Sequence, residues 1–304
     1  MEYLHALLIQ TGFHLLLGLS VYTVGLTGQI SFGQQGFYAI GAYLAAIGTT
    51  LWGMPLVPAL LLGALVSAGV GFVIGFPALR VKGLYLAIAT FAFGEIVRLG
   101  LINLYYTRTV RGIEVGPVGA EGFRHISYFN DNGWTTSDVL LLVTVVVLLV
   151  LALYAFLERS RLGVTIRAVG ADELAASMAG IHVVGIKVGA FAIGAFVAGL
   201  GGGLYAHYTT FLNHQAFGLS LGVISVAYAL VGGFGSFIGP IAGVLFFLAL
   251  TEGLRFLGEY RMMIYGAIFV LAMNVRPHGL IDETVAHRVR QWFQLRFRPA
   301  VGKG

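Results

Sequence analysis

Long apolar runs separated by short polar segments are the dominant pattern of this chain. The clearest run, Val139–Leu157, holds nineteen residues without a charge, and Asp138 and Glu158 flank it. About 20 apolar residues in a helix cross the roughly 30 Å hydrocarbon core of a bilayer. The run therefore predicts a transmembrane helix whose ends are set by the flanking charges.

The same reading along the whole chain predicts nine membrane spans. Long charge-free runs favour helices, because the strands of a membrane barrel alternate lipid-facing and lumen-facing residues. We expect an all-α, polytopic transmembrane helical bundle of about eight to ten spans, with Gly36–Trp52 and Leu219–Gly232 short enough to be broken or re-entrant. The other expected spans are Leu4–Leu26, Leu56–Leu79, Leu84–Leu104, Val139–Leu157, Ile186–His207, Ile241–Leu257 and Met262–Val275.

Two glycine-rich segments, Thr27–Gly36 and Val231–Pro240, interrupt these spans. Non-helical backbone at membrane depth is tolerated only where protein buries it or where it lines a wet cavity, and in carriers such breaks commonly surround the substrate. The segments are therefore candidates for a translocation path, although each is equally compatible with an ordinary turn at the membrane interface. The candidate path residues are Gln29, Ser31, Gln34, Gln35, Gly232, Gly233 and Gly235.

Composition supports the membrane assignment. Hydrophobic residues make up 58% of the chain and charged residues 10%, against about 25% charged residues in soluble domains. The 44 glycines are about twice the usual share of roughly 7%, and small residues let membrane helices approach closely. The net charge of +5 does not indicate nucleic-acid binding, because the basic residues lie at the ends of spans and in the tail.

The basic residues also predict the orientation. With segment 158–186 in the cytoplasm, twelve of the eighteen lysines and arginines fall on the inner side, as membrane proteins prefer. Tyr105–Ser137 then becomes the largest external loop. The N-terminus lacks a basic region and a small-residue cleavage site, so we expect Leu4 onward to be a retained span.

No motif predicts bond chemistry. The chain has no phosphate-binding GxxxxGK[ST] loop and no cysteine, and its eight histidines are scattered. We therefore expect no catalytic residue, no metal site and no cofactor, and a protein that is not an enzyme.

Two charges fall within an expected span. Glu95 and Arg98 are three residues apart, so they share a helix face and can pair. Ionisable residues in a membrane usually face the bundle interior. We interpret the pair as an intramembrane structural ion pair, with a role in the translocation path as the alternative. Glu252 and Arg255 repeat the spacing.

The polar segment 158–186 carries a short helix pattern. Asp172 and Glu173 would lie in its first turn, where negative charge meets the positive end of the helix dipole, and Gly180 stands where a terminal glycine belongs. A two-turn helix does not hold together alone in water. It must pack against a partner protein, against the rest of the bundle or against lipid.

Several motifs in one order resemble the branched-chain amino acid (Liv-type) permease family. They are Thr27–Gly33, Phe37–Tyr43, Phe93–Arg98, Gly203–Tyr208, Val231–Ser236 and Arg276–Leu280, and Leu174–Ile181 looks like the EAA coupling segment of ATP-binding-cassette importers. The Gly-Glu-Ile-Val-Arg segment and the Arg-Pro-x-Gly-Leu ending resemble the M-type member of the usual permease pair.

The resemblance implies residues 1–281 as a permease domain, with segment 158–186 as the coupling loop and a basic cytoplasmic tail at 282–304. It further implies a second (H-type) permease subunit, two cytosolic ATP-binding subunits, an extracytoplasmic substrate-binding protein and a bacterial inner membrane. The coupling residues it implies are Arg167, Asp172, Glu173, Ala175, Ala176, Met178 and Gly180.

The chain departs from the family pattern at two places. Leu174 occupies the position of the usual EAA glutamate, and segment 107–120 is longer and more charged than the family's turn. Two alternatives stay open: the same machinery importing urea or short amides, and an ion-coupled carrier or channel. The tail suits either an interfacial segment on anionic lipid or a disordered end.

Overall fold

The computed structural model describes residues 2–78, 80–110, 113–254, 261–275 and 279–281. It divides into two compact units, Met1–Val226 and Ala227–Gly304. The basic tail and Arg255 lie outside the described residues.

Helices account for most of the described residues of both units. The first unit contains α1 (Glu2–Gly25), α2 (Gln34–Thr50), α3 (Leu56–Ala78), α4 (Leu84–Ile102), α5 (Tyr128–Asp131), α6 (Thr136–Arg159), α7 (Arg161–Ala171), α8 (Glu173–Met178), α9 (Val183–Thr209) and the 3-10 turns η1 (Gly119–Glu121) and η2 (His214–Phe217). Helix α10 (Leu219–Gly232) contains the boundary, and α11 (Ile238–Gly253) and α12 (Arg261–Val275) follow in the second unit.

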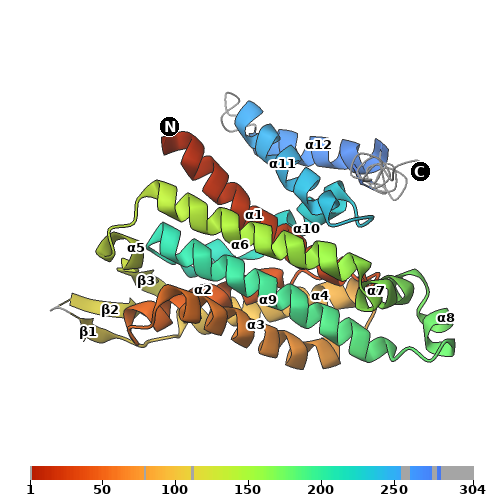
Figure 1. Cartoon of the computed structure of the whole chain (residues 1–304), viewed down its shortest axis with the longest axis horizontal. Coiled ribbons are helices and arrows are strands. Elements are labelled where there is room, and N and C mark those ends of the chain that lie inside the picture. Colours follow the sequence, from red (N-terminus) through yellow and green to blue (C-terminus); the bar gives the residue numbers. More distant parts are fainter. Residues whose placement is uncertain (1, 79, 111–112, 255–260, 276–278, 282–304) are drawn as a thin grey trace, which may run out of the picture. The chain divides into compact units, whose positions relative to one another are not determined.

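Helix α9 is the centre of the first unit and packs along α1, α2 and α3 (Figure 1). Glycines make these contacts close. A Cβ on Gly41 of α2 would collide with the backbone of Gly199, and one on Gly202 would collide with the carbonyl of Tyr38. The glycine excess thus lets the backbones of α2 and α9 touch.

Among the described residues, six helices are long and apolar enough to cross a membrane. They are Glu2–Gly25, Leu56–Ala78, Leu84–Ile102, Thr136–Arg159, Val183–Thr209 and His214–Gly232. The three remaining expected spans correspond to α2, α11 and α12, which have 17, 16 and 15 residues. A polytopic helical bundle is therefore correct, whereas the expected count of eight to ten spans is not established.

The fold is mostly helical as predicted, but the loop Tyr105–Ser137 adds a small sheet that the sequence analysis did not predict. This loop contains β1 (Arg108–Val110), β2 (Ile113–Pro117) and β3 (Phe123–Arg124), which form an antiparallel sheet in the order β1-β2-β3. Thr109 lies opposite Glu114 in the β1–β2 register. The loop is rich in β-branched residues, which favour strands. A search for long apolar runs does not detect short strands in a polar segment of this kind.

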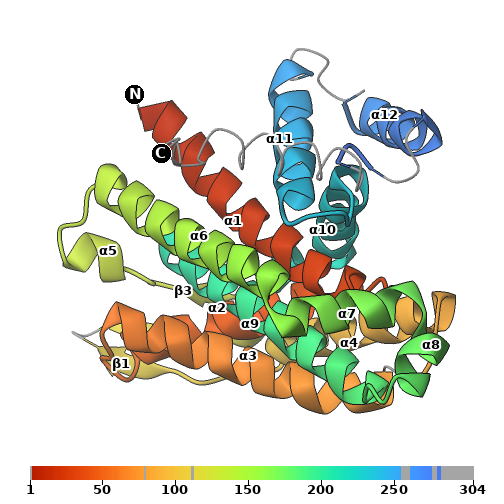
Figure 2. The same ribbon diagram turned by 45° about the vertical axis from the view of Figure 1, so that its right-hand side comes forward.

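The sheet and the α7–α8 pair lie at opposite ends of the first unit (Figures 1 and 2). At the sheet end, Phe123 and Leu212 exchange backbone hydrogen bonds of 2.9 Å. At the other end, Lys82 contacts Glu173 at 2.7 Å. The sheet and the α7–α8 pair are therefore held in place by contacts at the two ends of the first unit.

Candidate functional site

Helix α8 occupies the place of the short helix predicted in segment 158–186, and local hydrogen bonds close both of its ends. Asp172 Oδ1 accepts a hydrogen bond from the backbone N–H of Leu174 at 2.8 Å, as an N-cap residue does. At the other end Gly180 has a φ of 80°, and its N–H donates to the carbonyl of Ser177. This left-handed glycine is a common helix terminator. Helix α7, which precedes α8, was not predicted.

One face of α8 is apolar and uncovered within the described chain. Leu174 is 67% exposed and Met178 is 81% exposed. Ala175 and Gly180 are also exposed, but Ala176 is only 5% exposed and therefore lies against the chain itself. A free apolar face on a helix this short is unusual for a loop in water.

Glu173 lies at the centre of an ion cluster that joins three separate segments. Its carboxylate contacts Lys82, just before α4, at 2.7 Å and Lys187, in the first turns of α9, at 2.5 Å. Partial burial opposes the charged form of Glu173, but its hydrogen bonds and charge interactions with Lys187 and Lys82 outweigh this and lower its pKa. The cluster fastens α8 to the bundle and was not foreseen from the sequence.

Arg167 forms an ion pair within the protein itself. Its Nη2 lies 2.9 Å from Oε1 of Glu158 at the end of α6, and Tyr22 of α1 donates a hydrogen bond to the same oxygen at 2.7 Å. Glu158 is 7% exposed. The arginine therefore neutralises a buried carboxylate, and α7 is held against α1 and α6.

The break between α1 and α2 lies directly against α7. The break spans residues 26–33, and Gly28 within it has a φ of 74°. A Cβ on Gly28 would lie 2.9 Å from the carbonyl oxygen of Gly170 in α7, and one on Gly170 would collide with the carbonyl of Leu26. Helix α7 of segment 158–186 and the predicted path segment are therefore in backbone contact.

The polar residues at this break are buried. Ser31, Gln34 and Gln35 are 0% exposed and Gln29 is 5% exposed. Within the described residues, both amide atoms of all three glutamines lack a hydrogen-bond partner. An unpaired buried amide costs about 1–3 kcal/mol. Three such amides near one helix break indicate groups kept available for water or a ligand.

Gln35 reaches from α2 toward two other helices. A Cβ on Gly94 of α4 would lie 2.8 Å from Gln35 Nε2, and one on Gly222 of α10 would collide with Gln35 Oε1. The amide therefore fills the space that the two glycines leave between α4 and α10.

At the second predicted break, between α10 and α11, part of the backbone is hydrogen-bonded within the protein. Gly232 and Gly233 are buried, and the carbonyl of Gly232 accepts a hydrogen bond of 3.0 Å from the N–H of Ile281. Gly233 has a φ of 94°, and Gly235 is partly exposed. Part of this backbone is thus occupied within the second unit, which weakens its case as a binding surface.

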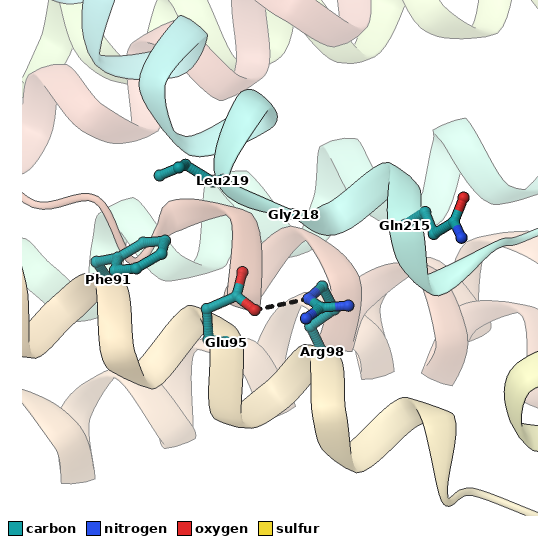
Figure 3. A pocket seen from close by; sticks show the side chains of 6 residues that line it. All are labelled: Phe91, Glu95, Arg98, Gln215, Gly218 and Leu219. Carbon is teal, nitrogen blue, oxygen red and sulfur yellow. Dashed lines mark hydrogen bonds and ion pairs between the residues drawn. The ribbon is translucent and has the colours of Figure 1, made fainter.

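The charged residues of α4 form a pair and line a cavity. Arg98 Nε donates to Glu95 Oε2 at 2.7 Å. The cavity has a volume of about 400 Å³, and Figure 3 shows both side chains at its wall together with Gln215 of η2. The matching pair expected at Glu252 and Arg255 includes a residue outside the described part of the chain.

Metal-ligand clusters are absent from the part of the chain that the structure describes. No group of three or more His, Cys, Asp or Glu side chains could hold an ion there.

Comparison with known proteins gives a consistent result. A family model described as "Branched-chain amino acid transport system / permease component" matches residues 3–273. The high-affinity branched-chain amino acid transport system permease proteins LivM of Salmonella typhimurium strain LT2 and of Escherichia coli strain K12 are 35% and 34% identical to this chain. Both matches cover 88% of this chain and 67% of the relative.

A further relative, the permease protein LivH of Escherichia coli strain K12, is 29% identical over 54% of this chain and 53% of its own length. Among solved structures, none matches the chain significantly. Since the family model spans most of the helices described above, this multi-pass membrane protein belongs to the family of branched-chain amino acid transport system permease components.

Proposed function

We propose that this chain is the M-type permease subunit of an ATP-driven importer for branched-chain or related apolar amino acids in a bacterial inner membrane. It forms half of the translocation path and catalyses no bond chemistry. Its partners are an H-type permease, two cytosolic ATP-binding subunits and an extracytoplasmic binding protein. The broader match to LivM than to LivH supports the M-type assignment.

The uncovered face of α8 is the observation that carries the proposal. Leu174 and Met178 expose apolar side chains on a helix that is capped at both ends and fastened to the bundle by Glu173. Such a face is suited to seat in an ATP-binding subunit. Among the coupling residues that the family resemblance implies, Asp172, Ala175, Met178 and Gly180 are exposed. Ala176 is buried against the chain itself, and Arg167 of α7 contacts Glu158 at the end of α6.

Contacts behind α8 provide a route for movement. A displaced α8 would move α7, and Gly170 of α7 would press on the α1–α2 break at Gly28. The unpaired glutamines at this break would then change their surroundings between inward and outward openings. Any such change requires different contacts in the two states.

The test is co-purification of the importer subunits with the variant Leu174→Gln, Met178→Gln. The variant should insert normally and lose the ATP-binding subunits, because its apolar face is gone. Val57→Gln is the matched control, since Val57 is similarly exposed, at 58%, but lies at the start of α3.

Uptake measurements separate the alternatives. Reconstituted wild-type importer should take up leucine, isoleucine or valine only when ATP and the binding protein are supplied. Uptake by this chain alone, without ATP, would instead identify an ion-coupled carrier or channel. Uptake of urea or short amides in place of amino acids would correct the cargo.

A further inference from the structure

The Glu95–Arg98 ion pair of α4 lines a cavity and leaves some of its hydrogen-bonding atoms unused. Glu95 and Arg98 are 23% and 24% exposed, and their contact uses one carboxylate oxygen and the Nε of the guanidinium. Within the described residues, the second oxygen of Glu95 and the terminal nitrogens of Arg98 have no further partner. Figure 3 shows that oxygen directed toward the Gly218–Leu219 segment and one terminal nitrogen of Arg98 directed away from Glu95.

The cavity has a charged end, formed by the Glu95–Arg98 pair, and an apolar end. It lies between α4 and the η2–α10 segment, and Phe91 and Leu219 line the side of it away from Arg98 and Gln215 (Figure 3). Its volume of about 400 Å³ lies within the usual range of roughly 300–1,000 Å³ for small-molecule sites. A small molecule with two opposite charges and an apolar side chain matches this lining.

An unpaired amide stands directly behind the cavity. Gly94 precedes Glu95, Gly222 lies one helical turn beyond Gly218, and the amide of Gln35 fills the space between these two glycines. Gln35 is fully buried and lacks a partner within the described residues. The amide of Gln35 is therefore the next hydrogen-bonding group toward the interior of the bundle, on the far side of Gly94 and Gly222 from the cavity.

We propose that this cavity binds the charged head group of a zwitterionic amino acid on its way through the permease. This inference rests on the proposed function and names its substrate contacts. The terminal nitrogens of Arg98 hold the α-carboxylate, since a guanidinium fork matches a carboxylate. The free oxygen of Glu95 holds the α-ammonium, and Phe91 and Leu219 face the apolar side chain. Gln35 receives the head group when α4 and α10 separate.

Such a site fits the physics of moving a zwitterion through a membrane. The two charges of the substrate lose hydration there, which is costly unless protein groups replace the water. The Glu95–Arg98 pair is neutral as a unit, so the empty site carries no uncompensated charge. Recognition falls on atoms that all α-amino acids share, and selection among side chains is left to other parts of the importer.

The test uses the assembled permease–ATPase complex in lipid nanodiscs, without the binding protein, and L-leucine as the probe in saturation-transfer NMR. Glu95→Gln and Arg98→Gln should each weaken leucine binding by about tenfold or more, because each removes a charge-assisted hydrogen bond. Glu114→Gln is the control, since it neutralises an exposed carboxylate in the sheet and should leave binding unchanged. Leucinamide, which lacks the carboxylate, should not compete.

A charge reversal distinguishes substrate binding from a purely structural ion pair. Glu95→Arg combined with Arg98→Glu keeps an ion pair, so the complex should assemble with the thermal stability of the wild type. Leucine binding should stay weak. With the two charges exchanged, the carboxylate and ammonium of leucine would have to bind in the opposite orientation, and its side chain would then point away from Phe91 and Leu219. Full recovery of leucine binding would overturn the proposal.

Two other results would also overturn it. One is equal leucine binding by the wild type, Glu95→Gln and Arg98→Gln, and the other is no binding by the wild type at any soluble leucine concentration. The proposed function fails by a different result, namely that the complete wild-type importer with its binding protein moves no amino acid.

Discussion

Gly28 and Gly170 are in backbone contact, so that a Cβ on Gly28 would lie 2.9 Å from the carbonyl oxygen of Gly170. Gly28 belongs to the break that carries the buried glutamines, and Gly170 belongs to α7, which leads into α8. No flexible side chain lies between them. A displacement of α7 therefore reaches the break without being absorbed by rotamer changes.

Gly170→Ala should uncouple transport from ATP hydrolysis. The added methyl would collide with the carbonyl of Leu26 and push α7 away from the break. Overpacking of this kind costs about 1–3 kcal/mol, so uptake by the reconstituted importer should fall about tenfold while ATP hydrolysis continues. Gly189→Ala is the control, because a Cβ on Gly189 meets nothing within 4 Å. Wild-type uptake by Gly170→Ala would contradict the route through α7.

Arg167→Met should destabilise the protein by removing the guanidinium that neutralises the buried carboxylate of Glu158. Breaking such a pair costs about 3 kcal/mol, at the lower end of the usual range, because the side chain of Arg167 is 34% exposed. Thermal unfolding in detergent measures the loss. Adding Glu158→Gln should restore part of the stability, since the uncompensated charge is then removed. If both variants unfold at the wild-type temperature, the pair does not hold α7.

Acid should loosen α8 through Glu173. The lysines Lys187 and Lys82 lower the pKa of Glu173 below its ordinary value of 4.5. A lowered pKa in the folded state contributes stability that is present above the ordinary value and is lost as the pH falls through the folded value. Amide exchange of residues 174–179, corrected for its intrinsic pH dependence, should therefore stay constant near neutral pH and rise only below about pH 4.5.

Glu173→Gln supplies the control for this pH effect. It removes the titrating group, so its α8 should exchange faster at neutral pH and show no further step in acid. An acid step of equal size in the variant would assign the effect to another group.

Gln34→Met should stabilise the protein and impair transport. The amide of Gln34 is fully buried without a partner in the described residues, and replacing such an amide by an apolar group of similar size removes a penalty of about 1 kcal/mol or more. We expect a higher unfolding temperature together with slower uptake. Gln10→Met, at an exposed position on α1, should change neither. Undiminished uptake by Gln34→Met would remove this residue from the path.

The sequence predicted the features that depend on local pattern. Apolar runs located the helices, because a lipid-facing helix needs only length and hydrophobicity. Asp172 and Gly180 located the ends of α8, because helix caps act within one turn. The inference that Glu95 and Arg98 pair follows from the geometry of a helix turn.

Other features depend on segments that are distant in the sequence. Lys82 and Lys187 are separated by more than a hundred residues, and only the packing of α4, α8 and α9 brings both to Glu173. The hydrogen bond from Tyr22 to Glu158 and the position of Gln35 between α4 and α10 arise in the same way. The small sheet was missed because hydropathy describes membrane spans and not the loops that join them.

The touching backbones of α2 and α9 set a limit on how this permease works. Where Gly41 meets Gly199 and Gly202 meets Tyr38, the two helices have no side chains that could re-pack to let them tilt apart. During each transport cycle they must travel as one stiff block. We expect relative motion between α1 and this block to be taken up in residues 26–33, the non-helical break between α1 and α2.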